Sequence, residues 1–209
     1  NVYAVGRYGT ILHYDGNVAG TWSPVDTGSV TSLELRSAWG SSEDDIFVVG
    51  YEGIILHYDG ITWSTMNSGT TRDLLGVWGS SATDVYAVGG GYNGDNNPDD
   101  GIILHYDGTA WSAMTSGTIH NLNGIWGRSG DDAFAVGDNG TILHYDGQEW
   151  SAMASGASSN HLRAVWAGSS TDVYAVGDGG TVLHYQETPS VLPAIASVSP
   201  AQAVQGAEN

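Results

Sequence analysis

Most of the chain alternates short segments of apolar and small residues with sequences that favour turns, a pattern typical of β-strands joined by hairpins. One stretch shows the pattern in full, with predicted strands at residues 122–126, 132–136, 141–145 and 149–153. Asp138-Asn139-Gly140 predicts a tight hairpin, because Asn-Gly readily adopts the positive φ angles of a type I′ turn. No apolar period of 3.6 residues persists, so we predict no helix longer than two turns within residues 1–185.

This four-strand unit repeats along the chain. The tripeptide Leu-His-Tyr occurs five times, with its histidines at positions 13, 57, 105, 144 and 184. All eight tryptophans fall into two series, one at 39, 78, 126 and 166 and the other at 22, 63, 111 and 150. Repeated four-stranded antiparallel units predict an all-β fold, a β-propeller of about five blades. We place the repeat units at residues 1–27, 33–67, 73–115, 121–154 and 161–185.

The two terminal blades are predicted to be incomplete in this chain. The first unit begins inside its second strand, and the last unit ends after its third. We therefore expect an open ring, whose exposed sheet edges favour completion by upstream residues or self-association with a neighbouring chain. Residues 186–209 are a poor substitute, because Pro189 and Pro193 lack the N–H group that a ladder needs.

The charge balance narrows the classes of partner. The chain carries 23 acidic residues and five arginines, with no lysine, for a net charge of −18. Such a charge repels phosphate backbones and anionic membranes, so we expect no nucleic-acid partner. No apolar run reaches the roughly 18 residues of a membrane helix, so no direct membrane insertion is expected. Without cysteine, disulfides and thiolate chemistry are excluded.

Residues 122–126, 133–143 and 146–150 together carry a family resemblance. Their order, Leu-x-x-Ile-Trp, Ala-Phe-Ala-Val-Gly-Asp-Asn-Gly-Thr-Ile-Leu and Asp-Gly-x-x-Trp, resembles bacterial Asp-box (BNR) repeats. It is most similar to the propellers of the photosystem II assembly factor type, and the likeness covers residues 1 to about 185. His replaces the usual Ser/Thr, and the Asp-to-Trp spacing is one residue shorter. The resemblance implies the propeller fold and leaves the activity open, because propellers host many functions.

Residues 186–209 depart from the repeat. The segment 189–200 resembles the opening of an immunoglobulin-like IPT/TIG domain, and a Pro/Ala linker is the alternative. The resemblance implies a modular parent, so we expect an extracellular or cell-surface location within a larger secreted bacterial protein.

Positions that are constant among the repeats are predicted to be structural. We expect each repeat histidine to hydrogen-bond neighbouring backbone within its blade, with a ring of metal-binding imidazoles as the alternative. The tryptophans are predicted to pack between sheets. An aspartate precedes the second strand of four units, and we expect it to bond its own backbone in a turn; these are Asp45, Asp84, Asp132 and Asp172.

The third unit departs from the repeat with a polar insertion at residues 89–101. Asp95, Asn97 and Asp99 alternate within it, and oxygen ligands at this spacing can wrap Ca²⁺. The match to an EF-hand is partial, because Asp100 stands where the glycine belongs and no Glu closes the loop. Calcium is the one cofactor that the sequence suggests, and a plain polar loop is the alternative.

Strand alternation places this insertion on the same face as the loops that connect one blade to the next. That face is predicted to carry a group of basic, imidazole and amide side chains suited to an anion or to sugar hydroxyls: Arg36, Arg72, His120, Asn160, His161 and Arg163. The alternative is a scatter of unrelated loop residues.

We therefore expect a non-catalytic binding or structural module that recognises a glycan or a protein through the face bearing the 89–101 insertion. No catalytic residue is assigned, since Gly-Lys phosphate loops, Gly-x-Ser-x-Gly and His-Glu-x-x-His are all absent from the sequence. A glycoside hydrolase or lyase using two carboxylates remains an alternative, because Asp is plentiful. A factor that assembles a protein complex is another alternative.

Overall fold

The computed structural model describes residues 2–16, 20–28, 30–91, 101–156, 159–169 and 172–186. These residues form 18 strands in five antiparallel sheets. The first sheet holds β1 (Val2–Val5), β2 (Ile11–Tyr14) and β3 (Ser23–Pro24). The second holds β4 (Leu35–Ser42), β5 (Asp45–Gly50), β6 (Ile55–Tyr58) and β7 (Trp63–Met66).

The remaining sheets repeat this order along the chain. The third holds β8 (Asp73–Ser81), β9 (Asp84–Gly90), β10 (Ile102–Tyr106) and β11 (Trp111–Met114). The fourth holds β12 (Leu122–Ser129), β13 (Asp132–Gly137), β14 (Ile142–Tyr145) and β15 (Trp150–Ala152). The fifth holds β16 (Leu162–Ser169), β17 (Asp172–Gly177) and β18 (Val182–Gln186).

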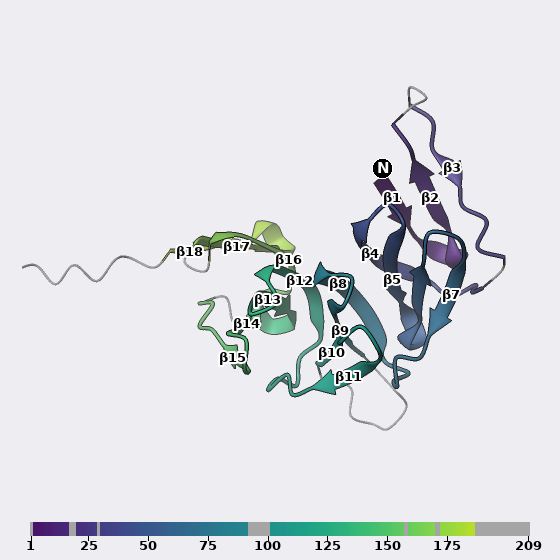
Figure 1. Ribbon diagram of the computed structural model, residues 1–209. Helices are drawn as coiled ribbons and strands as arrows, with labels where there is room; N and C mark the ends of the chain where they lie inside the picture. Colours follow the sequence, from purple (N-terminus) through teal and green to yellow (C-terminus); the bar gives the residue numbers. More distant parts are fainter. Residues whose placement is uncertain are drawn as a thin grey trace, which may run out of the picture.

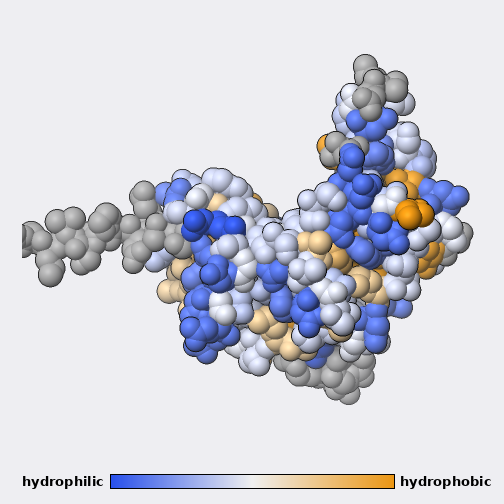
Figure 2. Space-filling view, viewed as in Figure 1, coloured by the Kyte–Doolittle hydropathy of each residue, from blue (hydrophilic) through white to orange (hydrophobic). Residues whose placement is uncertain are grey.

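The sheets are arranged as propeller blades around an open arc. The inner strands β4, β8, β12 and β16 lie side by side in chain order, and the other strands of each sheet extend outward from them (Figure 1). The surface is hollowed between the first and the last sheet (Figure 2). The predicted all-β propeller is confirmed, and so is the incompleteness of both terminal blades, which have three strands each in the described part of the chain. Residues 187–209 lie outside the described residues.

The hydrophobic core lies between neighbouring sheets. The ring of Tyr86, on β9 of the third sheet, is 5.8 Å from the ring of Tyr145 and 6.4 Å from that of Trp150, both in the fourth sheet. Phe47 of the second sheet makes the same contacts with Tyr106 and Trp111 of the third. Because each sheet needs the next one to cover its aromatic row, the core is divided into four clusters in the described residues.

The repeat histidines bond within their own blades, but the expected partner was wrong. Each imidazole stacks on an aromatic ring of the preceding strand, with centroids 4.1 Å apart for Tyr174 and His184. In four blades the imidazole Nε2 lies within 3.0 Å of an aspartate oxygen rather than backbone, in the pairs His57–Asp45, His105–Asp84, His144–Asp132 and His184–Asp172.

The four aspartates of these pairs were expected to bond their own backbone, and this expectation was also wrong. Besides the imidazole, the carboxylate of Asp45 accepts a hydrogen bond from the Ser41 hydroxyl, and that of Asp132 accepts one from the Arg128 guanidinium. The aspartate side chain is long enough to reach the third strand, where it lies within hydrogen-bonding distance of the imidazole of the repeat histidine.

The helical segments in the described residues are four turns of three residues each, η1 (Arg7–Gly9), η2 (Tyr51–Gly53), η3 (Asp138–Gly140) and η4 (Asp178–Gly180). The predicted type I′ hairpin is confirmed at η3, where Asn139 has a φ of 53° and Gly140 one of 69°. Glu52 occupies the same position as Asn139 in the second blade, with a φ of 56°. An exposed Glu held in this left-handed region carries a conformational cost.

Replacing Glu52 by Asn is expected to raise the free energy of unfolding by about 0.5–1 kcal/mol, because Asn tolerates the left-handed region better. The backbone bond from the Glu52 N–H to the Asp73 carboxylate would be kept. Urea unfolding followed by circular dichroism measures the change. Glu149→Asn is the control, because Glu149 is exposed and is not among the residues with positive φ. An equal gain in both variants would contradict the strain argument.

Candidate functional site

Each inner strand carries a β-bulge near its start, and the bulge leaves one residue without a partner in the β-ladder. The pairing between β12 and β13 passes from Leu122 directly to Gly124, so Asn123 has no partner in the ladder. The other inner strands skip the equivalent residue in the same way, which gives four bulge residues: Arg36, Leu75, Asn123 and Arg163. Bulges re-aim side chains and are frequent next to functional sites.

All four bulge residues line one cavity of about 380 Å³ beside the propeller axis, which we call the axial cavity. The residue after each bulge is small, and these also line the cavity: Ser37, Gly76, Gly124 and Ala164. At Gly124 an added Cβ would lie 2.9 Å from the carbonyl oxygen of Arg163. Small side chains therefore let the inner strands approach one another, while the bulge residues vary and give the cavity its chemistry.

Arg163 is the most strongly positioned cation of the axial cavity. Its Nε and Nη2 donate to the two carboxylate oxygens of Asp178 at 2.9 and 2.6 Å, and its Nη1 lies 4.0 Å from Asp138. The hydrogen bonds from Arg163 hold the pKa of Asp178 below its ordinary value, and the same bonds raise the pKa of Arg163. Half of the Arg163 side chain stays exposed, so the guanidinium is presented to solvent.

Arg36 and Asn123 occupy the other bulges. Arg36 donates to Glu34 at 2.7 Å, and its guanidinium carbon lies 5.5 Å from the centre of the Tyr51 ring. The Asn123 amide donates to Asp138 at 2.8 Å and to the Leu162 carbonyl at 2.9 Å. The lining of the cavity thus combines two guanidinium groups and an amide with small and apolar residues. The carboxylates that pair with these polar groups are not among the lining residues.

The other predicted site residues lie on the surrounding loops. His161 places its Nδ1 2.8 Å from Asp138, beside the cavity. Asn160 donates to the Thr181 hydroxyl at 2.6 Å, and His120 faces Asn139 at 3.3 Å. Arg72 is not among the residues that line the axial cavity. Of the six predicted residues, Arg36 and Arg163 line the cavity, and the other four are not among its lining residues.

The predicted arrangement of loops on one face is visible in the backbone bonds. The N–H of Asp138, in a turn between the second and third strands, donates to the Asn121 carbonyl of a connection between blades at 2.9 Å. A Cβ added at Gly101, at the end of the 89–101 insertion, would lie 2.4 Å from the His120 carbonyl oxygen. Asp95, Asn97 and Asp99 lie outside the described residues, so the calcium site stays a prediction.

Sequence reasoning missed Asn123, Leu75 and Asp138 as site residues. Asn123 and Leu75 carry a signal that is visible in the repeats, because each stands between a constant Leu and a constant small residue. Asp138 carries no such signal, because an acidic residue in a hairpin turn resembles any other turn residue.

The two faces of the propeller differ in charge. Arg7, Arg36, Arg72 and Arg163 lie in the turns and strand ends of the axial-cavity face, and Arg128 is the only arginine on the opposite face. That opposite face holds the Asp-Gly turns, where two backbone N–H groups donate to each of Asp59, Asp107 and Asp146 and lower the pKa of these carboxyls. An anionic ligand is therefore repelled least at the axial cavity.

Among the described residues no group of three or more His, Asp or Glu side chains is placed to hold a metal ion. No helix in the described part of the chain is both long and apolar enough to cross a membrane.

No protein-family model and no curated protein matches this sequence. Three solved structures are similar to it. YCF48 from Cyanidioschyzon merolae has a TM-score of 0.63 and 12% identity, with 88% of this chain covered. The chain spans 65% of the length of that protein. The computationally designed protein Ika4 has a TM-score of 0.56 and 14% identity, covering 73% of this chain and 91% of its own.

A structure described as YCF48 bound to D1 peptide has a TM-score of 0.37 and 14% identity, and 89% of each chain is covered. Sequence identities this low support a similar fold and nothing further. The proposed likeness of the turns to Asp-box repeats, and of the tail to an IPT/TIG domain, stays a prediction. On the sheet order and on its likeness to YCF48, this chain is a β-propeller.

Proposed function

We propose that this chain is a non-catalytic binding module that recognises a protein partner at the axial cavity. The ligand would be an extended segment that presents a carboxylate, either an acidic side chain or a free C-terminus. The observation that carries the proposal is the convergence of the four bulge residues on one cavity, with Arg36 and Arg163 both half exposed within it.

The geometry of Arg163 supports a carboxylate ligand. A guanidinium binds a carboxylate through two parallel hydrogen bonds, and Arg163 already holds Asp178 in this way. The Asp178 side chain is itself about half exposed, so a ligand carboxylate can exchange with it at the same fork. The scarcity of basic side chains elsewhere supports the same site.

The contents of the cavity favour binding over catalysis. Its acidic neighbours are engaged with cationic or amide groups, Asp178 with Arg163 and Asp138 with Asn123. A carboxylate-based hydrolase instead needs one carboxyl kept protonated by an apolar site. Neither carboxyl is in such surroundings, and the pKa of Asp178 is lowered rather than raised.

The proposal is tested with fluorescein-labelled decapeptides of acidic, neutral and basic sequence, each with a free or an amidated C-terminus. We expect saturable binding of the acidic or free-carboxylate peptides. Binding should weaken at least about tenfold in the Arg36→Gln/Arg163→Gln variant, since charge-assisted hydrogen bonds are lost. Arg128→Gln is the control, because it removes an arginine that pairs with an aspartate, Asp132, on the opposite face.

Equal weakening by Arg128→Gln would contradict the proposal, because it would reduce the effect to overall charge. A glycan array, with and without Ca²⁺, runs beside the peptides. Retention of a glycan without peptide binding would replace the protein partner by a carbohydrate. Turnover of a polysaccharide that is lost with a carboxylate variant would replace the binding module by a hydrolase.

A further inference from the structure

The four bulge residues follow one another around the axial cavity in a fixed order. The inner strands β4, β8, β12 and β16 are neighbours in that order. Their bulge residues are, in turn, Arg36, Leu75, Asn123 and Arg163. Two guanidinium groups therefore lie at the ends of a row, with an apolar side chain and an amide between them. A ligand that contacts the whole row meets these chemical groups in this order.

The inner strands approach one another closely at the level of the bulges. A Cβ added at Gly76 of β8 would lie 3.3 Å from backbone atoms of Gly124 and Ile125 on β12. The Val77 N–H of β8 donates to the Ser37 hydroxyl of β4 at 3.3 Å. The bulges of neighbouring strands therefore lie next to one another, and the arginines of the first and last strands are held apart by the two strands between them.

Leu75 is the exception among the bulge residues, because it is apolar where the other three are polar. It is only partly buried, and it belongs to none of the four hydrophobic clusters of the described residues. The preceding residue, Leu74, is fully buried in one of these clusters. The core of the blade therefore does not require a leucine at position 75, and the side chain is available to bury an apolar group of a ligand.

Both arginines of the row can hold a carboxylate of a ligand. Arg36 donates to Glu34 through Nη1 at 2.7 Å, and Arg163 donates to Asp178 through Nε and Nη2. A guanidinium group has five N–H donors, so donors remain at each arginine after these bonds are made. Since both side chains are about half exposed, two carboxylates can be bound at once, one at each end of the row.

Asn123 supplies a hydrogen-bond acceptor between the two guanidinium groups. Its amide nitrogen donates to Asp138 and to the Leu162 carbonyl, so its carbonyl oxygen is the atom left to accept a hydrogen bond from a ligand. The backbone N–H of an extended peptide segment is such a donor. A peptide segment therefore uses the amide as well as the arginines, whereas a simple diacid uses the arginines alone.

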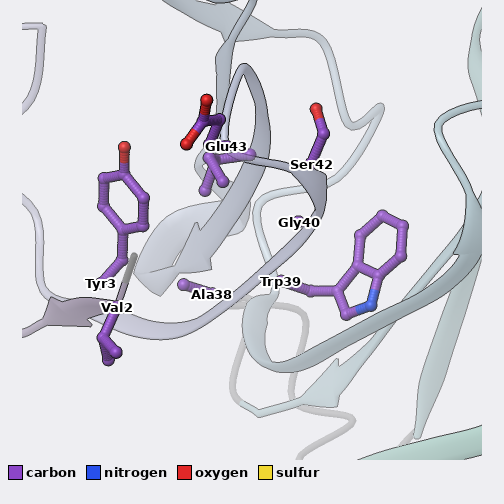
Figure 3. A pocket seen from close by; sticks show the side chains of 8 residues that line it. Val2, Tyr3, Ala38, Trp39, Gly40, Ser42 and Glu43 are labelled. Carbon is purple, nitrogen blue, oxygen red and sulfur yellow. The ribbon is translucent and has the colours of Figure 1, made fainter. Parts of the chain in front are cut away.

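A second pocket in the described residues has the opposite charge. It has a volume of about 340 Å³ and lies between β1 and β4 (Figure 3). Its lining includes Glu43 and no arginine or histidine. The lining of the axial cavity includes Arg36 and Arg163 and no acidic residue. Charge therefore favours an acidic segment at the axial cavity and disfavours it at this second pocket.

We propose that the axial cavity selects an extended segment with two acidic side chains and an apolar side chain between them, an inference that rests on the proposed function. Alternate side chains of an extended segment point to the same side, so residues i, i+2 and i+4 face the cavity together. The span from i to i+4 is about 13 Å. The apolar side chain lies against Leu75, which becomes a specificity-determining residue, and the carboxylates lie against Arg36 and Arg163.

The probe is a nonapeptide, Gly-Ser-Glu-Ser-Leu-Ser-Glu-Ser-Gly, labelled with fluorescein at its N-terminus and amidated at its C-terminus. Its control, Gly-Leu-Glu-Ser-Ser-Ser-Glu-Ser-Gly, has the same composition but places the leucine on the other side of the segment. By fluorescence anisotropy the probe should bind about tenfold more tightly than the control, because its leucine is buried on binding. Replacing either glutamate of the probe by glutamine should weaken binding about tenfold, because charge-assisted hydrogen bonds are lost.

Two variants of the chain test the contact with Leu75. Leu75→Gln should lower the affinity for the probe to that for the control peptide, while binding of the control peptide persists. Leu75→Ala should have the same effect without adding a polar group. Ile61→Gln is the matched control, because it replaces an exposed apolar side chain in a turn of the opposite face. Far-ultraviolet circular dichroism and thermal unfolding establish that each variant is folded.

Failure of this inference differs from failure of the proposed function. If neither peptide binds, both are overturned. If both peptides bind equally, or if the preference for the probe survives in Leu75→Gln and Leu75→Ala, the central apolar contact is wrong while the carboxylate site stands. Equal loss of the preference in Ile61→Gln would also contradict that contact. If the probe with a single glutamate binds as tightly as the probe with two, the second carboxylate is wrong.

Discussion

Tyr86→Ala is expected to lower the free energy of unfolding by about 3–5 kcal/mol, and Tyr174→Ala by about 1 kcal/mol. Both tyrosines stand at the same position of the repeat, opposite its histidine. Tyr86 is 2% exposed and lies against the next blade, whereas Tyr174, on the last blade, is 36% exposed. The cavity left by truncation is enclosed in the first case and open to water in the second.

Urea unfolding of the two variants, followed by far-ultraviolet circular dichroism, measures the difference. Tyr86→Phe separates the ring from its hydroxyl, which donates to the Gly130 carbonyl at 3.0 Å, and should cost about 1 kcal/mol. Burial also raises the pKa of Tyr86, so its phenol stays neutral through the range of the measurement. Similar losses in Tyr86→Ala and Tyr174→Ala would show that stability does not depend on the contact between blades.

Gly137→Ala is expected to lower the free energy of unfolding by about 3 kcal/mol or more, whereas Gly6→Ala should leave it nearly unchanged. Gly137 is the last residue of β13, and Gly6 directly follows β1. A Cβ at Gly137 would lie 2.0 Å from the Asn121 carbonyl oxygen, which belongs to the backbone leading into the inner strand. At Gly6 an added Cβ meets no atom within 4 Å.

Thermal unfolding of both variants at equal concentration tests this pair. Gly137 and Gly6 have φ angles of −159° and −170°, so neither needs the left-handed region that only glycine readily adopts. The expected difference therefore comes from the clash alone. Comparable destabilisation at Gly6 would indicate that another segment occupies the inner edge of the first blade.

The pattern of the sequence was sufficient to predict the strands and turns of a blade, but it did not predict the contacts between its side chains. The turn at Asn139-Gly140 was predicted, because its φ angles follow from local chemistry. The pairing of His57 with Asp45 was not, because it joins two strands through side chains whose directions depend on the register. Both an aspartate that closes a turn and an aspartate that pairs with an imidazole are read from the sequence only as aspartate.

The candidate site was predicted in part for a similar reason. Arg36 and Arg163 were assigned to one face from strand alternation alone, and they do line one cavity. Asn123 was missed, because its role depends on a bulge that removes it from the ladder. Arg72 was included because it lies on the correct face, but distance from the axis is a property of the assembled ring.

The repeat of Trp, Leu-His-Tyr and Asp-Gly determined by itself that the chain folds into four-stranded blades, since each unit contains its own strands and turns. Only the tertiary structure decided which copies of a residue are buried and which bulge residues meet at the axis. Strand formation depends on neighbours along the chain, whereas burial depends on the next blade, and identical repeats encounter different neighbours.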